Sequence, residues 1–406
     1  MSVKGRFDLI IQGGGLTGLA LAAAVGGVGG RVLLVEERPL SVTTAARFDG
    51  RVTAIARGSK QALGSIGAWA GMAEAAEAIL EIEVGEADSL GSVHYDAAEV
   101  GGEPLGWIVP NQAIRQGLLE AIAAAGSAVT IAAPASIETL ARDAGGVEAR
   151  LEDGRMVRGA LLAVCEGRFS GTRETLGIGA RRWDYGQTGL VCTFAHELPH
   201  RGRAVERFFP DGPFAMLPLP GNRSSIVWAL ESGLAKAVAA LDDAAFTAEV
   251  QERFGDSLGR LALEGHRWSY PLILVWSHAY VAERAVLVGD AARGIHPIAG
   301  QGWNLALRDV TAIAEIVVDR LRLGLDPGSA DALERYAAWR SFDSLALVAV
   351  TDGINRLFAN DILPLKLARG AGLGLVERLP VAKRFFMRHA MGLVGDLPRL
   401  MRGEAL

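Results

Sequence analysis

Residues 7–18 read FDLIIQGGGLTG, and this stretch decides the fold. Its first half is a nearly continuous apolar run, which predicts a strand buried on both faces of a parallel sheet. Residues 19–25, LALAAAV, predict a helix whose small side chains pack closely on that sheet. Residues 31–35, RVLLV, predict a second strand. The chain therefore begins with a strand–helix–strand unit.

The glycines of this unit match the dinucleotide-binding pattern G-x-G-x-x-G. They allow a tight turn, let a pyrophosphate reach backbone N–H groups at the helix N-terminus, and let the helix pack closely on the sheet. Glu36 ends the second strand, where a carboxylate accepts hydrogen bonds from a ribose. The alternative is an ordinary glycine-rich turn. The residues expected to bind the dinucleotide here are Gly13, Gly15, Leu16, Thr17, Gly18 and Glu36.

A second candidate ligand region lies near residue 290. Residues 285–288 predict another buried strand, which runs into Gly289-Asp290, and an acid at the carboxyl end of a strand lies where open α/β sheets bind ligands. Gly300 and Gly302 then precede a predicted helix, whose bare N-terminus would stabilise negative charge on a reduced flavin. Taken singly, these features also fit a plain turn and a plain loop.

Composition narrows the class of protein. The chain has 406 residues, enough for about two or three domains, and is 50% hydrophobic, which predicts a large core and excludes a disordered chain. A net charge of -5 argues against nucleic acid as a partner. The two cysteines, Cys165 and Cys192, form no C-x-x-C pair, so neither a disulfide framework nor a metal site is predicted. We expect no signal peptide and no transmembrane helix.

The C-terminal segment has its own charge pattern. Residues 354–406 contain nine Lys/Arg and four Asp/Glu among many Leu, Phe and Met residues. This pattern is typical of a helical element that lies on a lipid surface, and equally of a helical cap with a solvated basic face. In the first case, five basic residues would face anionic lipid: Lys366, Arg369, Lys383, Arg384 and Arg388.

Together these segments resemble the group A flavoprotein aromatic hydroxylases, and in detail their ubiquinone-biosynthesis branch, the FAD-dependent polyprenylphenol hydroxylases. The resemblance covers nearly the whole chain. Its most specific part is residues 296–305, HPIAGQGWNL, and shorter matches include residues 49–51, DGR, and residues 351–353, TDG. The resemblance implies bound FAD, with NAD(P)H as a transient co-substrate that has no Rossmann domain of its own.

The resemblance also implies a role for particular residues. Arg51 and Arg115 would lie near the flavin and pyrophosphate, although ordinary surface arginines are the alternative. Glu166 stands where the family usually has an aspartate in a motif near FAD and NAD(P)H. His296 and Pro297 are the candidate catalytic residues, in the motif that would face the flavin. His296 would have a positioning role, with core packing as the alternative, Pro297 would shape the backbone beside the ring, and no catalytic base is expected. The further residues expected to hold FAD are Gly289, Asp290, Gly300, Gln301, Gly302 and Asn304.

The expected fold is α/β: a Rossmann-like FAD-binding domain of the aromatic hydroxylase type, with an inserted, mainly antiparallel substrate sheet and a C-terminal helical region. Expected boundaries are residues 1–75, 100–178 and 272–340 for the FAD-binding domain, 76–99 and 179–271 for the substrate domain, and 341–406 for the helical region. Four residues are candidates for an apolar pocket, with core packing as the alternative for each: Phe208, Phe214, Met216 and Leu217.

The expected function is hydroxylation of the aromatic ring of a polyprenylphenol in ubiquinone biosynthesis, with NAD(P)H and O2, through a C4a-hydroperoxyflavin. We expect a cytoplasmic protein, with peripheral contact at the inner face of the membrane and membership of a quinone-biosynthesis assembly left open. Two other functions also stay open: hydroxylation of a small soluble phenol, and a flavin-binding subunit without turnover.

Overall fold

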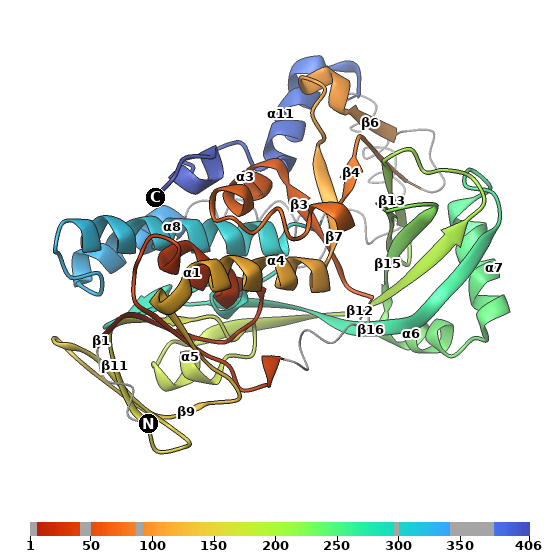
Figure 1. Cartoon of the computed structure of the whole chain (residues 1–406). Coiled ribbons are helices and arrows are strands. Elements are labelled where there is room, and N and C mark those ends of the chain that lie inside the picture. Colours follow the sequence, from red (N-terminus) through yellow and green to blue (C-terminus); the bar gives the residue numbers. More distant parts are fainter. Residues whose placement is uncertain (1–5, 41–49, 87–91, 296–299, 342–376) are drawn as a thin grey trace.

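The computed structural model describes residues 6–40, 50–86, 92–295, 300–341 and 377–406. In these residues the strands form two eight-stranded sheets and one three-stranded sheet. Figure 1 shows the first sheet with helices α1, α4 and α8 at one side of the molecule and the second sheet with α7 at the other. His296 and Pro297 lie outside the described residues.

The first sheet has the strand order β17-β18-β11-β1-β2-β8, and β9 and β10 extend it from β11. β1 runs parallel to β2 and to β11, and β11 runs parallel to β18, so their carboxyl ends meet at one edge. The strands are β1 (Arg6–Gln12), β2 (Val32–Val35), β8 (Val129–Ala132), β9 (Ile137–Asp143), β10 (Gly146–Leu151), β11 (Met156–Val164), β17 (Val281–Ala282) and β18 (Ala285–Leu287).

One helix covers this sheet closely because its side chains are small. In α1 (Leu16–Gly26) every residue from Gly18 onward is buried, and four of them are alanines. Figure 1 shows α1 between α4 (Asn111–Ala124) and α8 (Gly302–Arg322). A further helix spans 330–341. Shorter helical segments are α3 (Arg57–Ser65), α5 (Gly171–Thr175), η3 (Gly126–Ala128) and η4 (Gly289–Ala291).

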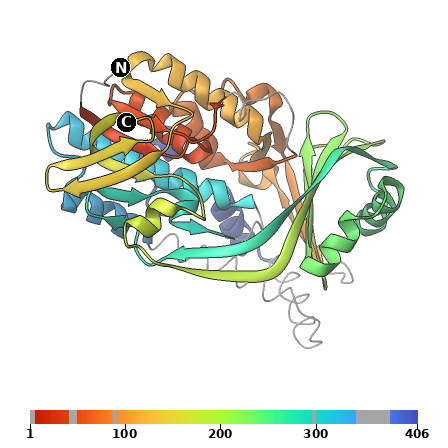
Figure 2. The ribbon, with the colours of Figure 1, turned by 90° about the horizontal axis from the view of Figure 1, so that it is seen from below.

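The second sheet has the order β19-β16-β12-β15-β14-β13-β5-β6, and all its pairs are antiparallel except β13 with β5. Figure 2 shows β12 and β16 as long strands that run from the first sheet's side of the molecule to the far end of the second sheet. The strands are β5 (Glu81–Glu86), β6 (Ser92–Asp96), β12 (Ala180–His196), β13 (Arg203–Phe209), β14 (Gly212–Leu219), β15 (Arg223–Glu231), β16 (Leu261–Ser277) and β19 (Arg293–Gly294).

A separate apolar core lies behind the second sheet. Trp228 of β15 and Phe194 of β12 are fully buried there against Phe246 of α7 (Asp243–Phe254). The helix α6 (Ser232–Ala239) adds Ala235 and Val238 to the same core.

Figure 1 shows the third sheet, β3-β7-β4, between the other two sheets. Its strands are β3 (Val52–Ala56), β7 (Gly106–Pro110) and β4 (Glu77–Ile79). Met387 and Met391 of the C-terminal region pack in the same core cluster as Ile79 and Ile108 of this sheet. The remaining helical elements are η1 (Ala73–Ala75), η2 (Ala97–Val100), α11 (Pro380–Ala390) and η6 (Arg399–Arg402).

The expected fold class is confirmed: a parallel sheet covered by helices, a mainly antiparallel second sheet, and a C-terminal helical region. The predicted strand at 285–288 is present as β18, and the predicted helix after Gly302 is α8. The domain boundaries stay a prediction. Within the expected substrate-domain segment 76–99, strands β5 and β6 join the second sheet, whereas β4 pairs in the third.

Candidate functional site

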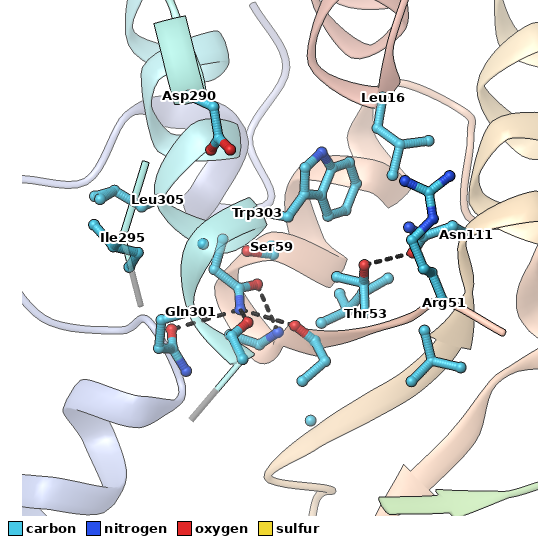
Figure 3. Close-up of a pocket in the computed structure, with 18 of the residues that line it drawn as sticks. Leu16, Arg51, Thr53, Ser59, Asn111, Asp290, Ile295, Gln301, Trp303 and Leu305 are labelled. Atoms are coloured by element: carbon cyan, nitrogen blue, oxygen red, sulfur yellow. Dashed lines mark hydrogen bonds between the residues drawn. The ribbon is translucent and has the colours of Figure 1, made fainter. Parts of the chain in front are cut away.

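A cavity of about 1960 Å³ opens at the carboxyl edge of the first sheet. Typical ligand pockets measure about 300–1,000 Å³, so this cavity has room for a dinucleotide and a second organic molecule together. All three sheets contribute to its wall. Figure 3 shows Asp290, Trp303, Leu16 and Arg51 around it.

The glycine loop forms one end of the cavity, and two of its positions, Gly13 and Gly18, have no room for a larger residue. A Cβ on Gly18 would lie 1.9 Å from the carbonyl oxygen of Gly13, and a Cβ on Gly13 would lie 2.7 Å from the main chain of Cys165. Gly13 also has a φ of 106°, which favours glycine. A Cβ on Gly15 would meet no atom of the described residues within 4 Å, so the backbone there is open to a ligand. Leu16 and Thr17 complete this wall.

Two side chains hold the loop, one from the end of β2 and one from α4. Glu36 lines the cavity, and its carboxylate accepts hydrogen bonds from the N–H of Gly14 at 2.5 Å and of Arg38 at 2.9 Å. Arg115 of α4 donates from Nη1 to the carbonyl oxygen of Gly14 at 2.9 Å. Glu36 is therefore oriented at the end of β2, where the ribose is expected. Arg51 also lines the cavity, near Asn111 in Figure 3.

Four helices present their N-termini to this cavity: α1, α3, α4 and α8. None of the four has a side-chain cap among the described residues, and none has an acidic residue in its first turn. In contrast α5, α6 and α7 are capped by Ser170, Glu231 and Asp242. Each uncapped N-terminus presents a positive dipole end, although the N–H groups of Gly58 in α3 and Asn111 in α4 donate to main-chain carbonyl oxygens. The cavity therefore favours an anionic or strongly polar group.

Asp290 lies in the η4 turn that follows β18, and its side chain lines the cavity. Its Oδ2 accepts a hydrogen bond from Nη2 of Arg168 at 3.1 Å. Burial raises the pKa of Asp290 above its usual range, and the positive charges of Arg168 and Arg293 act against that rise. Gly289 precedes it with a φ of 64°, and a Cβ there would lie 3.0–3.1 Å from Ala306 and Thr17. The turn therefore packs directly on α1 and α8.

The start of α8 lies next to Asp290 in the cavity wall. A Cβ on Gly300 would lie 3.0 Å from the Cβ of Ala54, whereas the nearest atom to one on Gly302 is 4.0 Å away. Asn304 donates from Nδ2 to the carbonyl oxygen of Ala54 and accepts from the N–H of Ala56 through Oδ1. Its amide thus ties α8 to β3. Gln301 lines the cavity beside it.

Glu166 lies in the cavity wall where β11 has ended. Its carboxylate accepts from Nε2 of Gln12 at 2.7 Å, from the hydroxyl of Ser170 at 2.5 Å, and from both the N–H and the hydroxyl of Thr172. These four donors occupy the carboxylate. We therefore expect Glu166 to act by holding Gln12 and the start of α5 in place.

Two polar atoms on the wall are buried without a protein partner. Oε1 of Gln12 and the hydroxyl of Ser59 have no hydrogen-bond partner among the described residues, and both residues line the cavity. The glycine loop, the oriented carboxylate of Glu36, four helix N-termini without side-chain caps among the described residues, and these polar atoms together fit a dinucleotide with a pyrophosphate. The residues present therefore fit FAD.

The far half of the cavity is apolar because strands of the second sheet alternate their side chains. In β14, Pro213, Ala215 and Leu217 face the cavity, while Phe214 and Met216 face the core behind the sheet. Of the four pocket candidates, Phe208 and Leu217 line the cavity and Phe214 and Met216 pack in the core. Other apolar residues of this wall are Ile82, Val84, Val93, Ala204, Val227 and Ala229.

Some residues of the site were not predicted as such. Arg168 pairs with Asp290, and Gln12 supports Glu166, but both signals need the strand order that brings the two segments together. The α11 residues that line the cavity, such as Phe385 and Phe386, come from a segment interpreted only as a tail. Among the described residues no group of three or more His, Cys, Asp or Glu is placed to hold a metal ion.

Known proteins resemble the chain over nearly its full length. It is 47% identical over 402 residues to the ubiquinone hydroxylase UbiL of Rhodospirillum rubrum, a match that covers 98% of this chain and 93% of the relative. It is 32% identical to the 3-demethoxyubiquinol 3-hydroxylase of Escherichia coli, over 95% of this chain and 98% of the relative. It is 28% identical to the human mitochondrial ubiquinone biosynthesis monooxygenase COQ6, over 95% and 92%.

Solved structures confirm the fold. The chain aligns with PqsL of P. aeruginosa, in complex with 2-aminobenzoylacetate, with a TM-score of 0.77 and 24% identity, over 91% of this chain and 99% of that one. It aligns with the p-nitrophenol 4-monooxygenase PnpA of Pseudomonas putida DLL-E4 with a TM-score of 0.78 and 16% identity, over 96% and 99%.

Asp290→Ala tests the turn at the cavity wall. The change should weaken FAD binding about 10-fold to 100-fold, since polar groups of the ligand and Arg168 would lose a partner worth about 1–3 kcal/mol. Titration of the apoprotein with FAD, followed by flavin fluorescence, measures the Kd. Asp211→Ala, which breaks the ion pair between Arg253 of α7 and Asp211 in the β13–β14 turn, serves as the matched control. An unchanged Kd for Asp290→Ala would remove this residue from the site.

Glu166→Ala tests the hydrogen bonds by which Glu166 holds Gln12 and the start of α5. The variant should unfold at a Tm lower by about 2–5 °C, because several donors lose their acceptor. Differential scanning calorimetry of the apoprotein measures this change. Glu174→Ala is the control, since Glu174 lies in α5 itself and pairs with Arg182 at the surface. A normal Tm combined with slow flavin reduction by NAD(P)H would instead show that Glu166 contacts the nicotinamide cofactor.

A family model also matches the chain. The model described as an FAD binding domain matches residues 6–347, which is most of the chain. This range includes the glycine loop, Glu36, Glu166 and the Gly289–Asp290 turn, all of which border the cavity. The chain therefore belongs to the FAD-binding domain family, and its cofactor is FAD.

Proposed function

We propose that this protein hydroxylates the aromatic ring of a polyprenylphenol intermediate of ubiquinone biosynthesis, using NAD(P)H and O2. The proposal is supported by similarity over nearly the whole chain to proteins named as ubiquinone hydroxylases. The observation that carries it is the continuous cavity, which joins a dinucleotide-binding end to an apolar end built by the second sheet.

The size and lining of the apolar end fit a substrate with a prenyl tail. The phenol ring would lie where the start of α8 meets the second sheet, and the tail would lie along Ile82, Val84 and Leu217. Burying such a tail gains about 25 cal/mol per Å² of apolar surface, so a long chain contributes much of the binding energy. A small soluble phenol would leave most of this wall without a contact.

The bound flavin would supply the redox chemistry, accepting a hydride from NAD(P)H and activating O2, one atom of which enters the ring while the other leaves as water. The protein's own groups hold and orient the flavin and the substrate. The open N-terminus of α8 stabilises negative charge beside Asp290. Apolar side chains of β14 and β5 keep water from the ring. Burial raises the pKa of the Cys165 thiol well above its usual range, so this cavity residue stays protonated.

Quinone analysis of a deletion strain tests the function. A strain that lacks this protein should accumulate a polyprenylphenol without one ring hydroxyl, and the wild-type gene should restore ubiquinone while an Asp290→Ala gene should not. The mass of the accumulated compound identifies the missing hydroxyl. A normal quinone profile in the deletion strain, with a small phenol as the only compound hydroxylated by the purified protein, would favour the soluble-phenol alternative.

We also propose that α11 contacts the membrane from which the substrate comes. Val381 is 76% exposed, Phe385 56% and Phe386 46%, and Arg384 and Arg388 are exposed on the same helix. Phe385 and Phe386 also line the cavity, so the exposed apolar surface is continuous with the substrate site. Aromatic side chains beside arginines are typical of a helix that lies in a lipid interface. In the described residues, no helix is both long and apolar enough to span a bilayer.

One expectation about this tail was wrong. Lys383 is only 5% exposed, and its Nζ binds Glu99 at 2.8 Å and Glu377 at 3.2 Å. These ion pairs fasten α11 to η2, so Lys383 cannot face lipid. Lys366 and Arg369 lie outside the described residues. Contact with other proteins of the pathway and a cytoplasmic location stay predictions.

Replacing Arg384 and Arg388 with Gln tests the membrane contact. Neither residue lines the cavity, and about 1 kcal/mol per basic residue at a lipid surface predicts about 30-fold weaker binding to acidic vesicles. Turnover of vesicle-borne substrate should fall while turnover of a soluble short-chain analogue should not. Arg150→Gln with Arg158→Gln is the control, because it removes the same charge from another exposed surface. Vesicle binding equal to that of the control would contradict the proposal.

A further inference from the structure

A cluster of three buried charges lies beneath the Gly289–Asp290 turn. Asp309 of α8 and Arg340 of the helix at 330–341 are both 0% exposed, and Arg293 of β19 is 2% exposed. Oδ1 of Asp309 accepts from Nη2 of Arg293 at 2.5 Å and from Nε of Arg340 at 2.8 Å. The cluster therefore joins three elements that are distant in sequence.

Stability of the fold does not by itself require such a cluster. Burying an ion pair costs hydration free energy, and the attraction between the two charges barely offsets this cost. Apolar residues of the same volume often stabilise a fold equally well. Two guanidinium groups share one oxygen of a single carboxylate. Nε and Nη1 of Arg293 have no hydrogen-bond partner among the described residues, although its guanidinium lies 5.1 Å from the centre of the Tyr280 ring.

The cluster is bonded to the turn that carries Asp290. Oδ2 of Asp309 accepts the N–H of Gly289 at 3.0 Å, directly before Asp290. On the other side of Asp290, the carbonyl oxygen of Ala291 accepts from Nη1 of Arg173 and from the hydroxyl of Ser277, both at 3.1 Å. Buried side chains thus hold the backbone on both sides of Asp290, while its own side chain lines the cavity.

Two members of the cluster also act on the charge of Asp290. Burial disfavours the ionised carboxylate and so does the negative charge of Asp309, whereas the positive charge of Arg293 favours it. An ionised Asp290 accepts hydrogen bonds from hydroxyl groups of a ligand through both oxygens, whereas a protonated one has lost part of that capacity. The cluster is thus placed to affect both the orientation and the charge of this side chain.

We propose that Arg293, Asp309 and Arg340 form a positioning cluster for FAD: they fix the Gly289–Asp290 turn so that the Asp290 carboxylate faces the cofactor. None of the three lines the cavity, so they act through Asp290 rather than by contact. The proposal concerns cofactor binding, and it holds or fails independently of the substrate.

A double-mutant cycle tests this role. Asp309→Asn keeps an oxygen that can accept from Gly289 but removes the carboxylate charge, and we expect the Kd for FAD to rise at least 10-fold. In an Asp290→Ala background, the same change should raise the Kd less than 2-fold, since the residue through which it acts is gone. Flavin fluorescence gives the Kd of each apoprotein, and calorimetry gives its Tm. Equal effects of Asp309→Asn in both backgrounds would overturn the proposal.

Two further variants keep the test decisive. Arg293→Met leaves the Asp309–Arg340 ion pair and the bond to Gly289, so it should fold even where Asp309→Asn does not. We expect it to raise the Kd about 3-fold or more, and again only when Asp290 is present.

Asp326→Asn is the control, because it breaks the Arg284–Asp326 pair beside β18. It should lower the Tm without changing the Kd. A lower Tm with an unchanged Kd in Arg293→Met would show that the cluster only supports the fold.

Discussion

Helix α1 approaches the ends of β1 and β11 closely, and the cavity at the carboxyl edge of the first sheet depends on this constraint. A Cβ on Gly18 would lie 1.9 Å from the carbonyl oxygen of Gly13, and Gly13 itself lies against the main chain of Cys165. This packing leaves the first turn of α1 bare toward the cavity, and α3, α4 and α8 also begin there without side-chain caps among the described residues. Four positive helix ends at one place favour a polar, anionic ligand over any side chain of the protein.

The rest of the cavity follows from strand alternation. Because successive side chains of β14 point to opposite faces, one strand supplies Leu217 to the cavity and Phe214 to the core behind the sheet. The long strands β12 and β16 carry this sheet to the edge of the first one, as Figure 2 shows. A polar end and an apolar end are thereby joined in one space, with α11 at its margin.

Sequence patterns predicted the elements better than the contacts between them. The G-x-G-x-x-G spacing and the apolar run before it identify β1, α1 and the ligand edge, because those constraints are local. The pairing of Arg168 with Asp290, the clamp of Asn304 on β3 and the burial of Lys383 depend on which strands and helices become neighbours. Net charge in the tail suggested an outward Lys383, but its two carboxylate partners come from residues 99 and 377. Residues on a strand face, such as Phe208 and Phe214, required the register of the sheet.

Labelled oxygen gives the most direct test of the central claim, that one cavity holds both FAD and a phenol that receives an oxygen atom. The purified protein, loaded with FAD, should be supplied with NAD(P)H, 18O2 and a vesicle-borne polyprenylphenol, and the product analysed by mass spectrometry. We predict that each hydroxylated ring carries one 18O atom and that one NAD(P)H is consumed for each. Oxidation of NAD(P)H with release of hydrogen peroxide and no labelled ring, for every phenol tested, would contradict the claim.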